Sequence, residues 1–358
     1  MSQFSLSHKL YMAIASALLL LCAPIRQAKA ADFTGEPIFS EVNLFSTRIQ
    51  DNPTDIYFPV GSDAPATLPV ALLFQGALVD KTDYQNYAEI VARYGFAVVV
   101  PNNERTLVGP TGPVTGLFPE QGQIEDVLGF ISRQNQQPTS PLNGRLDADS
   151  LGLLGHSFGG AAGIASVQGL CLFPLCTDQT YELPAALKAG IFYGTNFDLG
   201  PQVGTPPINN QVPTGYIYGT RDGVTEPALT VEAFEKTLNP PKVLVEVSGA
   251  NHYGITNEDS FRDPVRPTLG QEIATDTIGQ WSGLFLRAHV LNDSEAFNYV
   301  YGTGATQNPV VTVRAVSPDA VETPEPSAIS GAIAMLAIAT GIRLRRESNR
   351  HSSEDEAL

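Results

Sequence analysis

The hydrophobic pattern changes along the chain and predicts two kinds of strand. Residues 41–49 and 54–60 alternate between apolar and polar side chains, which is typical of an antiparallel pair with one exposed face at the edge of a sheet. The later apolar runs are continuous, which is typical of strands that are buried on both faces. These runs are residues 68–74, 96–100, 151–154, 189–193, 215–218 and 243–247.

Helical patterns lie between and after the continuous runs. Residues 84–94, 122–135 and 273–291 have helical spacing, and a run of small residues at 160–165 opens another helix. Buried strands that alternate with helices predict the α/β class, with a mostly parallel central sheet and helices on both faces. No low-complexity segment interrupts residues 31–308, which we therefore expect to form a single domain.

The N-terminal segment has the pattern of a targeting signal. Lys9 precedes an apolar run at residues 10–24, and Ala28 and Ala30 form an A-x-A cleavage site. This pattern predicts a secretory signal peptide over residues 1–30 and export of the remaining chain.

The C-terminal segment has a second targeting pattern. Residues 307–319 are rich in Val and Pro and predict one more strand followed by a linker, which we place at residues 309–323. Residues 324–346 contain Pro-Glu-Pro, a short apolar stretch and an arginine cluster, and a polar tail follows at residues 347–358. The segment at 324–346 resembles a PEP-CTERM sorting signal, which implies transient membrane contact and recognition by a sorting protease. The alternative is a plain C-terminal membrane anchor.

Composition and cysteine content limit the class of protein. The chain of 358 residues is 43% hydrophobic, which is enough for one large core, and its net charge of −16 argues against a nucleic-acid partner. Without the signal peptide two cysteines remain, Cys171 and Cys176. In an exported protein such a close pair predicts a disulfide, with two buried thiols as the alternative. No spacing of Cys and His predicts a metal site, and the sequence implies no cofactor.

One short motif carries the candidate chemistry. Gly155-His156-Ser157-Phe158-Gly159 directly follows the apolar run at residues 151–154. A serine between glycines at a strand-to-helix turn is typical of a nucleophile elbow, because the sharp turn leaves no room for side chains at the glycine positions. The alternative is a glycine-rich turn with an inert serine.

A serine nucleophile needs a base, and the sequence favours His252. His252 lies in a loop directly after the run at residues 243–247, where the base of a Ser-Asp-His triad is expected. The other four histidines have simpler explanations. His8 lies in the predicted signal peptide and His351 in the polar tail, while His156 is adjacent to Ser157 and His289 lies inside a predicted helix.

The base in turn needs an acid that orients it. Asp222 follows the run at residues 215–218 in a turn at the carboxyl end of a strand, where the sites of open α/β sheets gather. Asp198 is the second candidate for this role. Backbone N–H groups of Phe158 and Ala77 are the predicted donors to the oxyanion, with Leu78 as the next choice for the second position.

The motifs occur in the order found in the chlorophyllase, PET-hydrolase and platelet-activating-factor acetylhydrolase branch of the α/β-hydrolases, which the chain resembles over about residues 54–291. The resemblance rests on the segments at residues 69–76, 94–101, 155–160, 219–223 and 249–254. It implies the α/β-hydrolase fold and cofactor-independent ester hydrolysis through an acyl-serine intermediate, carried by Ser157, Asp222 and His252.

The ester itself is not specified by these motifs. We expect a small-molecule or polymeric hydrophobic ester as substrate, and a periplasmic, membrane-anchored or extracellular location in a Gram-negative or cyanobacterial cell. The alternatives are a peptidase or thioesterase that uses the same triad, or a non-catalytic exported binding protein with a hydrolase fold.

Overall fold

The structure, a computed structural model, describes residues 33–109, 112–177 and 181–318. The chain divides into two units, residues 1–34 and 35–358, and every element described below belongs to the second. The predicted signal peptide at 1–30, the sorting segment at 324–346 and the polar tail at 347–358 lie outside the described residues.

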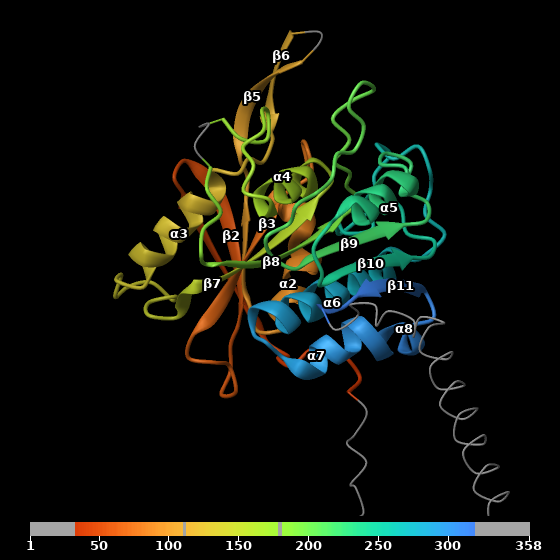
Figure 1. Ribbon diagram of the computed structural model, residues 1–358. Helices are drawn as coiled ribbons and strands as arrows, with labels where there is room; N and C mark the ends of the chain where they lie inside the picture. Colours follow the sequence, from red (N-terminus) through yellow and green to blue (C-terminus); the bar gives the residue numbers. More distant parts are fainter. Residues whose placement is uncertain (1–32, 110–111, 178–180, 319–358) are drawn as a thin grey trace, which may run out of the picture. The chain divides into compact units, whose positions relative to one another are not determined.

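A mixed, mostly parallel sheet forms the centre of the second unit (Figure 1). The strand order is β1-β2-β4-β3-β7-β8-β9-β10-β11, and the pairs from β4 to β10 are all parallel. The outer strands β1, β2 and β11 pair antiparallel with their neighbours. The strands are β1 Val42–Ile49, β2 Asn52–Pro59, β3 Leu68–Phe74, β4 Ala97–Pro101, β7 Leu146–His156, β8 Leu187–Tyr193, β9 Thr214–Gly219, β10 Lys242–Val247 and β11 Val311–Val316.

Helices connect the strands and cover the sheet, so the predicted α/β class is correct. They are η1 Lys81–Tyr84, α2 Gln85–Ala92, α3 Gln123–Gln134, α4 Phe158–Val167, α5 Pro227–Lys236, α6 Gln271–Val290, α7 Ser294–Asn298, η2 Tyr299–Thr303 and α8 Gly304–Gln307.

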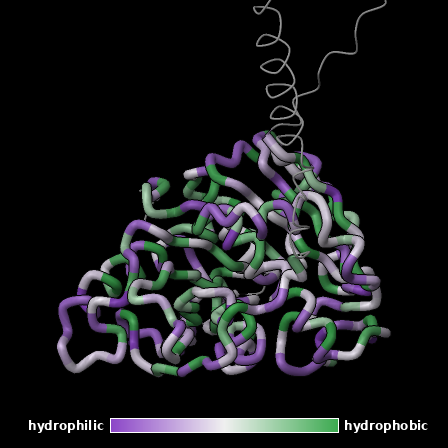
Figure 2. The backbone as a smooth tube through the Cα atoms, turned by 90° about the horizontal axis from the view of Figure 1, so that it is seen from below, coloured by the Kyte–Doolittle hydropathy of each residue, from purple (hydrophilic) through white to green (hydrophobic). Residues whose placement is uncertain are grey.

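The helices divide between the two faces of the sheet. Leu151 and Leu153 of β7 pack in one cluster with the buried side chains of α3, α4 and α5. Gly152 lies between them and therefore faces the other way. A Cβ at Gly152 would lie 2.8 Å from Leu286 of α6, so α6 covers the opposite face. The strands β3 and β4 are buried along their whole length, as expected for a sheet with two covered faces. Figure 2 shows that several of the peripheral loops, by contrast, are hydrophilic.

The strand β11 lies inside the segment at 307–319 where the sequence predicts one more strand, and it pairs with β10 through residue 316. It therefore takes up residues 311–316 of the segment assigned to the linker at 309–323. A two-stranded sheet, β5 Glu104–Gly109 and β6 Gly112–Leu117, was not predicted. It projects beyond the large sheet at the top of Figure 1. Among the described residues, every helix is too short or too polar to cross a bilayer.

Candidate active site

Ser157 occupies a strained turn between β7 and α4. Its φ of 55° and ψ of −121° are unfavourable for a residue with a side chain. A Cβ at Gly155 would lie 2.8 Å from the Cα of Gly160, and one at Gly159 would lie 2.2 Å from the carbonyl oxygen of Phe74. Both predicted elbow glycines are therefore required by close backbone contacts, as the motif indicates.

His252 and Asp222 form a buried pair. The Nδ1 of His252 lies 2.8 Å from Oδ2 of Asp222, and both side chains are almost fully buried. The other carboxylate oxygen of Asp222 accepts hydrogen bonds from the N–H groups of Val224 and Thr225, at 3.0 and 2.7 Å. These bonds fix the carboxylate in the orientation in which it receives Nδ1–H and leaves Nε2 of His252 free to accept a proton.

A second aspartate positions the histidine loop. The N–H of His252 donates to Asp263 at 2.9 Å, and Asp263 also accepts from the N–H of Val265 at 2.7 Å. Asp263 is fully buried. The sequence analysis did not identify it, because it lies eleven residues after His252 in a segment without regular structure.

Asp198, the second candidate for the acid, lies elsewhere. Its side chain is exposed and accepts a hydrogen bond from the N–H of Gly200. The structure pairs His252 with Asp222 and not with Asp198.

Ser157 and His252 lie on either side of the end of β8. The N–H of Ser157 donates to the carbonyl of Tyr193 at 3.0 Å. The next residue is Gly194, where a Cβ would lie 3.1 Å from Nδ1 of His252. Within the described part of the chain, no hydrogen bond joins the Ser157 hydroxyl to His252. In ligand-free sites this contact is often long, and the hydroxyl rotates about a single bond.

The turn after β3 lies beside the serine turn, because β3 pairs with β7 up to Phe74 and Gly155. The N–H of Gly76 donates to the Tyr84 hydroxyl at 2.7 Å, and the N–H of Leu78 donates to the carbonyl of Leu117 at 2.7 Å. Arg262 donates to the carbonyl oxygens of Ala77 and Leu78 at 2.9 and 3.1 Å. These contacts leave the N–H of Ala77 without an acceptor among the described residues, whereas the N–H of Leu78, the second choice, is already bonded.

His156 links two of these loops beneath Ser157. Its Nε2–H donates to the carbonyl of His252 at 3.0 Å, so its Nδ1 is the acceptor for the Tyr84 hydroxyl at 2.8 Å. Burial, reinforced by the neighbouring His252, holds the pKa of His156 well below its usual range, and burial raises the pKa of Tyr84. Both side chains are therefore neutral. The sequence analysis assigned His156 no role, because its partners are 72 and 96 residues away in sequence.

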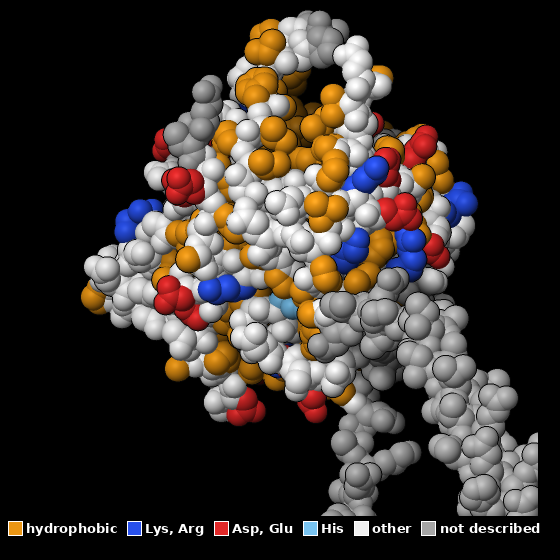
Figure 3. Space-filling model, in the orientation of Figure 1, with side chains coloured by type: hydrophobic (Ala, Val, Ile, Leu, Met, Phe, Trp, Pro, Cys, Tyr) orange, Lys and Arg blue, Asp and Glu red, His pale blue; other side chains and the backbone are white. Residues whose placement is uncertain are grey.

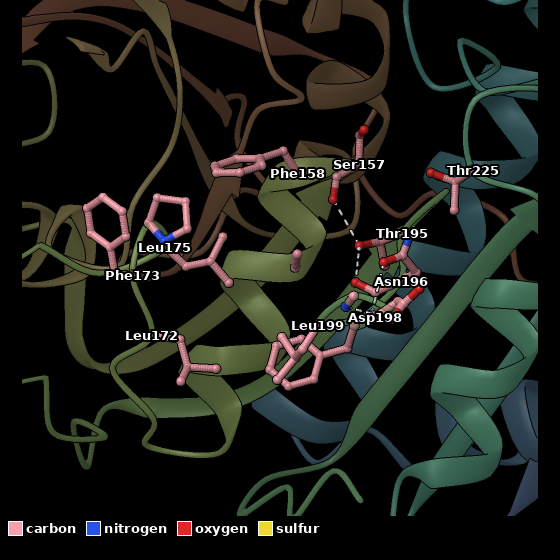
Figure 4. Close-up of a pocket in the computed structure, with 14 residues that line it drawn as sticks. Ser157, Phe158, Leu172, Phe173, Leu175, Thr195, Asn196, Asp198, Leu199 and Thr225 are labelled. Atoms are coloured by element: carbon pink, nitrogen blue, oxygen red, sulfur yellow. Dashed lines mark hydrogen bonds between the residues drawn. The ribbon is translucent and has the colours of Figure 1, made fainter. Parts of the chain in front are cut away.

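A cavity of about 630 Å³ opens beside Ser157 (Figure 4). One wall belongs to the loop between Cys171 and Cys176, which the structure joins as a disulfide. Figure 3 shows hydrophobic side chains gathered around a hollow beside the β5–β6 hairpin. The cavity is lined by Ser157, Phe158, Ala161, Leu172, Phe173, Pro174, Leu175, Thr195, Asn196, Phe197, Asp198, Leu199, Gly200 and Thr225.

The described residues contain no cluster of three or more His, Cys, Asp or Glu side chains that could hold a metal ion. A scan against models of known protein families finds no match, and a search of curated proteins finds no significant match.

Proposed function

We propose that the protein is an exported serine hydrolase of the α/β-hydrolase fold that cleaves hydrophobic carboxylic esters through an acyl-serine intermediate. The observation that carries this proposal is the position of Ser157, Asp222 and His252, each of which follows a parallel strand of the central sheet. They follow β7, β9 and β10, three parallel strands whose carboxyl ends meet at one edge of the sheet. The strained serine and the buried His252–Asp222 pair are the two parts that nucleophilic catalysis requires.

The first half-reaction transfers the acyl group to the enzyme. Nε2 of His252 takes the proton of the Ser157 hydroxyl while Oγ attacks the ester carbonyl carbon. The negative charge that forms on the carbonyl oxygen is stabilised by the N–H groups of Ala77 and Phe158, each worth about 3 kcal/mol of barrier. His252 then returns the proton to the alkoxide oxygen, the C–O bond breaks and the alcohol leaves.

The second half-reaction repeats these steps with water. His252 takes a proton from the water, whose oxygen attacks the acyl carbon, and the same two N–H groups stabilise the oxyanion. His252 gives its proton back to Oγ of Ser157, and the carboxylic acid leaves. The Asp222 carboxylate accepts Nδ1–H of His252 and stabilises the imidazolium that forms in both halves.

Two further features support this proposal. The strand order places β7, which ends at the serine turn, in the middle of the parallel strands, where it is flanked by β3 and β8. The turn after β3 carries Ala77 and therefore lies next to Ser157. In the α/β-hydrolase fold the second oxyanion donor comes from the corresponding turn.

The decisive experiment replaces the nucleophile. Purified parent protein should hydrolyse p-nitrophenyl esters and should be labelled at Ser157 by a fluorophosphonate. The Ser157→Ala variant should lose label and lower kcat by at least about 10³-fold, since only the oxyanion donors and binding remain. Equal hydrolysis by the parent and by Ser157→Ala would contradict the proposal.

The missing hydrogen bond between Ser157 and His252 favours one alternative, a non-catalytic exported binding protein. That alternative predicts no labelling of the folded parent by the fluorophosphonate. A peptidase or thioesterase would be labelled, and a panel of matched ester, thioester and amide substrates separates these activities from an esterase.

A further inference from the structure

We propose that the cavity beside Ser157 is the acyl-binding site for a medium-chain aliphatic carboxylic acid, and that the disulfide-closed loop Cys171–Cys176 is its fixed wall. The inference rests on the proposed ester hydrolysis at Ser157 and adds to it the class of acyl group and the side of the serine on which that group binds.

The position of the cavity indicates which half of the ester it holds. At the tetrahedral carbon, the carbonyl oxygen points to the N–H groups of Ala77 and Phe158, and the alcohol oxygen points to His252, which must protonate it. The cavity is lined by Ser157 and Phe158, but His252 and the turn at residues 75–78 are not part of its lining. The remaining substituent of the carbon is the acyl chain, which therefore enters the cavity.

The lining is suited to an uncharged aliphatic chain. Figure 4 shows Phe158, Leu172, Phe173 and Leu175 on one side of the cavity, and Thr195, Asn196 and Asp198 on the other. Oδ1 of Asn196 and Oδ1 of Asp198 already accept backbone hydrogen bonds from Asp198 and Gly200, and the Asp198 carboxylate disfavours a negatively charged chain. The Thr195 hydroxyl already donates to the carbonyl of Ser157 at 2.8 Å, so it does not demand a polar substrate. A volume of about 630 Å³ greatly exceeds the space that an acetyl group needs and leaves room for a medium-length aliphatic chain.

The wall is held in place by more than the disulfide. Gln121 is fully buried and bonds both ends of the loop, from its backbone N–H to the carbonyl of Leu175 at 2.9 Å and from its Nε2 to the carbonyl of Leu170 at 2.8 Å. The N–H of Cys176 donates to the carbonyl of Leu172 at 3.0 Å. Because the loop is fixed at both ends before the substrate binds, none of the binding energy of the acyl chain is spent on ordering the loop.

A pair of isomeric substrates tests the assignment. Methyl heptanoate carries its long chain on the acyl side, and hexyl acetate carries it on the alcohol side. The parent should favour methyl heptanoate. In a series of methyl esters, kcat/KM should rise about fourfold per added methylene, the equivalent of ~0.8 kcal/mol, until the cavity is full.

Two variants test the lining itself. Ala161→Phe adds a ring one helical turn after the serine and should lower kcat/KM for methyl heptanoate at least about 50-fold, with hexyl acetate changed less than about threefold. Phe173→Ser opens the rim at a side chain that is already 74% exposed, so the fold is retained, and should lower kcat/KM for methyl heptanoate about fivefold. Ala64→Phe is the matched control, because Ala64 is partly buried in the loop before β3 and does not line the cavity.

The possible results separate this inference from the proposed function. Suppose that the parent hydrolyses both isomers, and that the variants lower both activities equally or lower that for hexyl acetate more. This result would overturn the acyl assignment and leave the proposed function intact. A parent that hydrolyses no ester and takes no label at Ser157 would overturn the proposed function and this inference with it.

Discussion

At the scale of single residues, Ser157 adopts an unfavourable backbone conformation, and this conformation places its hydroxyl at the end of β7. A residue other than glycine at the φ and ψ of Ser157 costs of order 1–3 kcal/mol. The surrounding contacts hold it there, because Thr195 donates to the Ser157 carbonyl and the Ser157 N–H is bonded to Tyr193. Residues at the end of β8 therefore hold Ser157 in this strained conformation. Gly194, in the same segment, lies next to the His252–Asp222 pair.

The assignment of the acid gives a prediction at this scale. Asp222→Asn should lower kcat about 10⁴-fold at pH 7, because an amide stabilises the wrong tautomer of His252 and no longer stabilises its protonated form. Asp198→Asn should change kcat less than about tenfold, since the Asp198 carboxylate is exposed and makes no contact with His252. Steady-state kinetics with one p-nitrophenyl ester measure both, and the reverse order of effects would identify Asp198 as the acid.

The sequence predicts some of these residues and not others for a physical reason. Ser157, Asp222 and His252 each lie directly after a buried strand, and the parallel arrangement of the strands brings those positions to one edge. Asp263 and Tyr84 lie in no such position. Their contacts with His252 and His156 depend on how two loops fold over the sheet, which local spacing does not determine. Ala77 was chosen as an oxyanion donor from its place after β3, whereas the hydrogen bond from the N–H of Leu78 to the carbonyl of Leu117 depends on β6, which the sequence did not predict.

At the scale of elements, a buried line of hydrogen bonds joins the turn after β3 to the loop that carries His252. It runs from the N–H of Gly76 through the Tyr84 hydroxyl and the His156 ring to the carbonyl of His252. The four groups come from the turn after β3, from η1, from the end of β7 and from the loop after β10. Because the line passes next to Ser157, it fixes both loops relative to the nucleophile.

Tyr84→Phe tests this positioning role. The change leaves the N–H of Gly76 and Nδ1 of His156 unpaired, so stability should fall by about 1–3 kcal/mol. We expect kcat to fall about tenfold, with KM and the acidic limb of the pH–rate profile unchanged, because His252 and Asp222 are untouched. Urea unfolding and pH–rate profiles measure the two effects.

Tyr87→Phe is the matched control for that variant. Tyr87 is an equally buried tyrosine on α2, and among the described residues it makes no hydrogen bond to Gly76, His156 or His252. It should lose stability and keep its kcat. If both variants lowered kcat to the same extent, the line of hydrogen bonds would have only a structural role.

The two strands that the sequence did not predict, β5 and β6, pair with each other outside the core. The hairpin β5–β6 is largely exposed, so its apolar positions do not form the runs that identify a buried strand. The strand β11, by contrast, lies within residues 307–319, where the sequence predicts one more strand, and its pairing with β10 shows that it extends the central sheet. The buried central strands were predicted because burial on both faces constrains every residue in them.

At the scale of the whole molecule, two neutral histidines, the buried His156 and the partly buried His289, make stability depend on pH. His156 lies beside the active site and His289 lies on α6, where burial lowers the pKa of His289 to about 4. In the unfolded chain both rings have their ordinary pKa near 6.5. The folded state therefore binds fewer protons than the unfolded state between these values. Stability is retained above about pH 6.5 and is lost as the pH falls toward the folded pKa.

The contribution of His289 can be isolated because its surroundings are aromatic. The ring of Phe285 lies 4.7 Å away, and Tyr301 is its hydrogen-bond partner at 2.9 Å. His289→Phe keeps a ring in this cluster and removes the titrating group, so between pH 7 and pH 5 the parent should lose about 2 kcal/mol more stability than the variant. Tyr301→Phe removes the partner hydroxyl but keeps the partly buried imidazole, and should retain the parent's dependence on pH. Urea unfolding at both pH values gives the free energy of unfolding of all three proteins. If His289→Phe lost as much stability as the parent between pH 7 and pH 5, the His289 ring would be protonated as readily in the folded state as in the unfolded state.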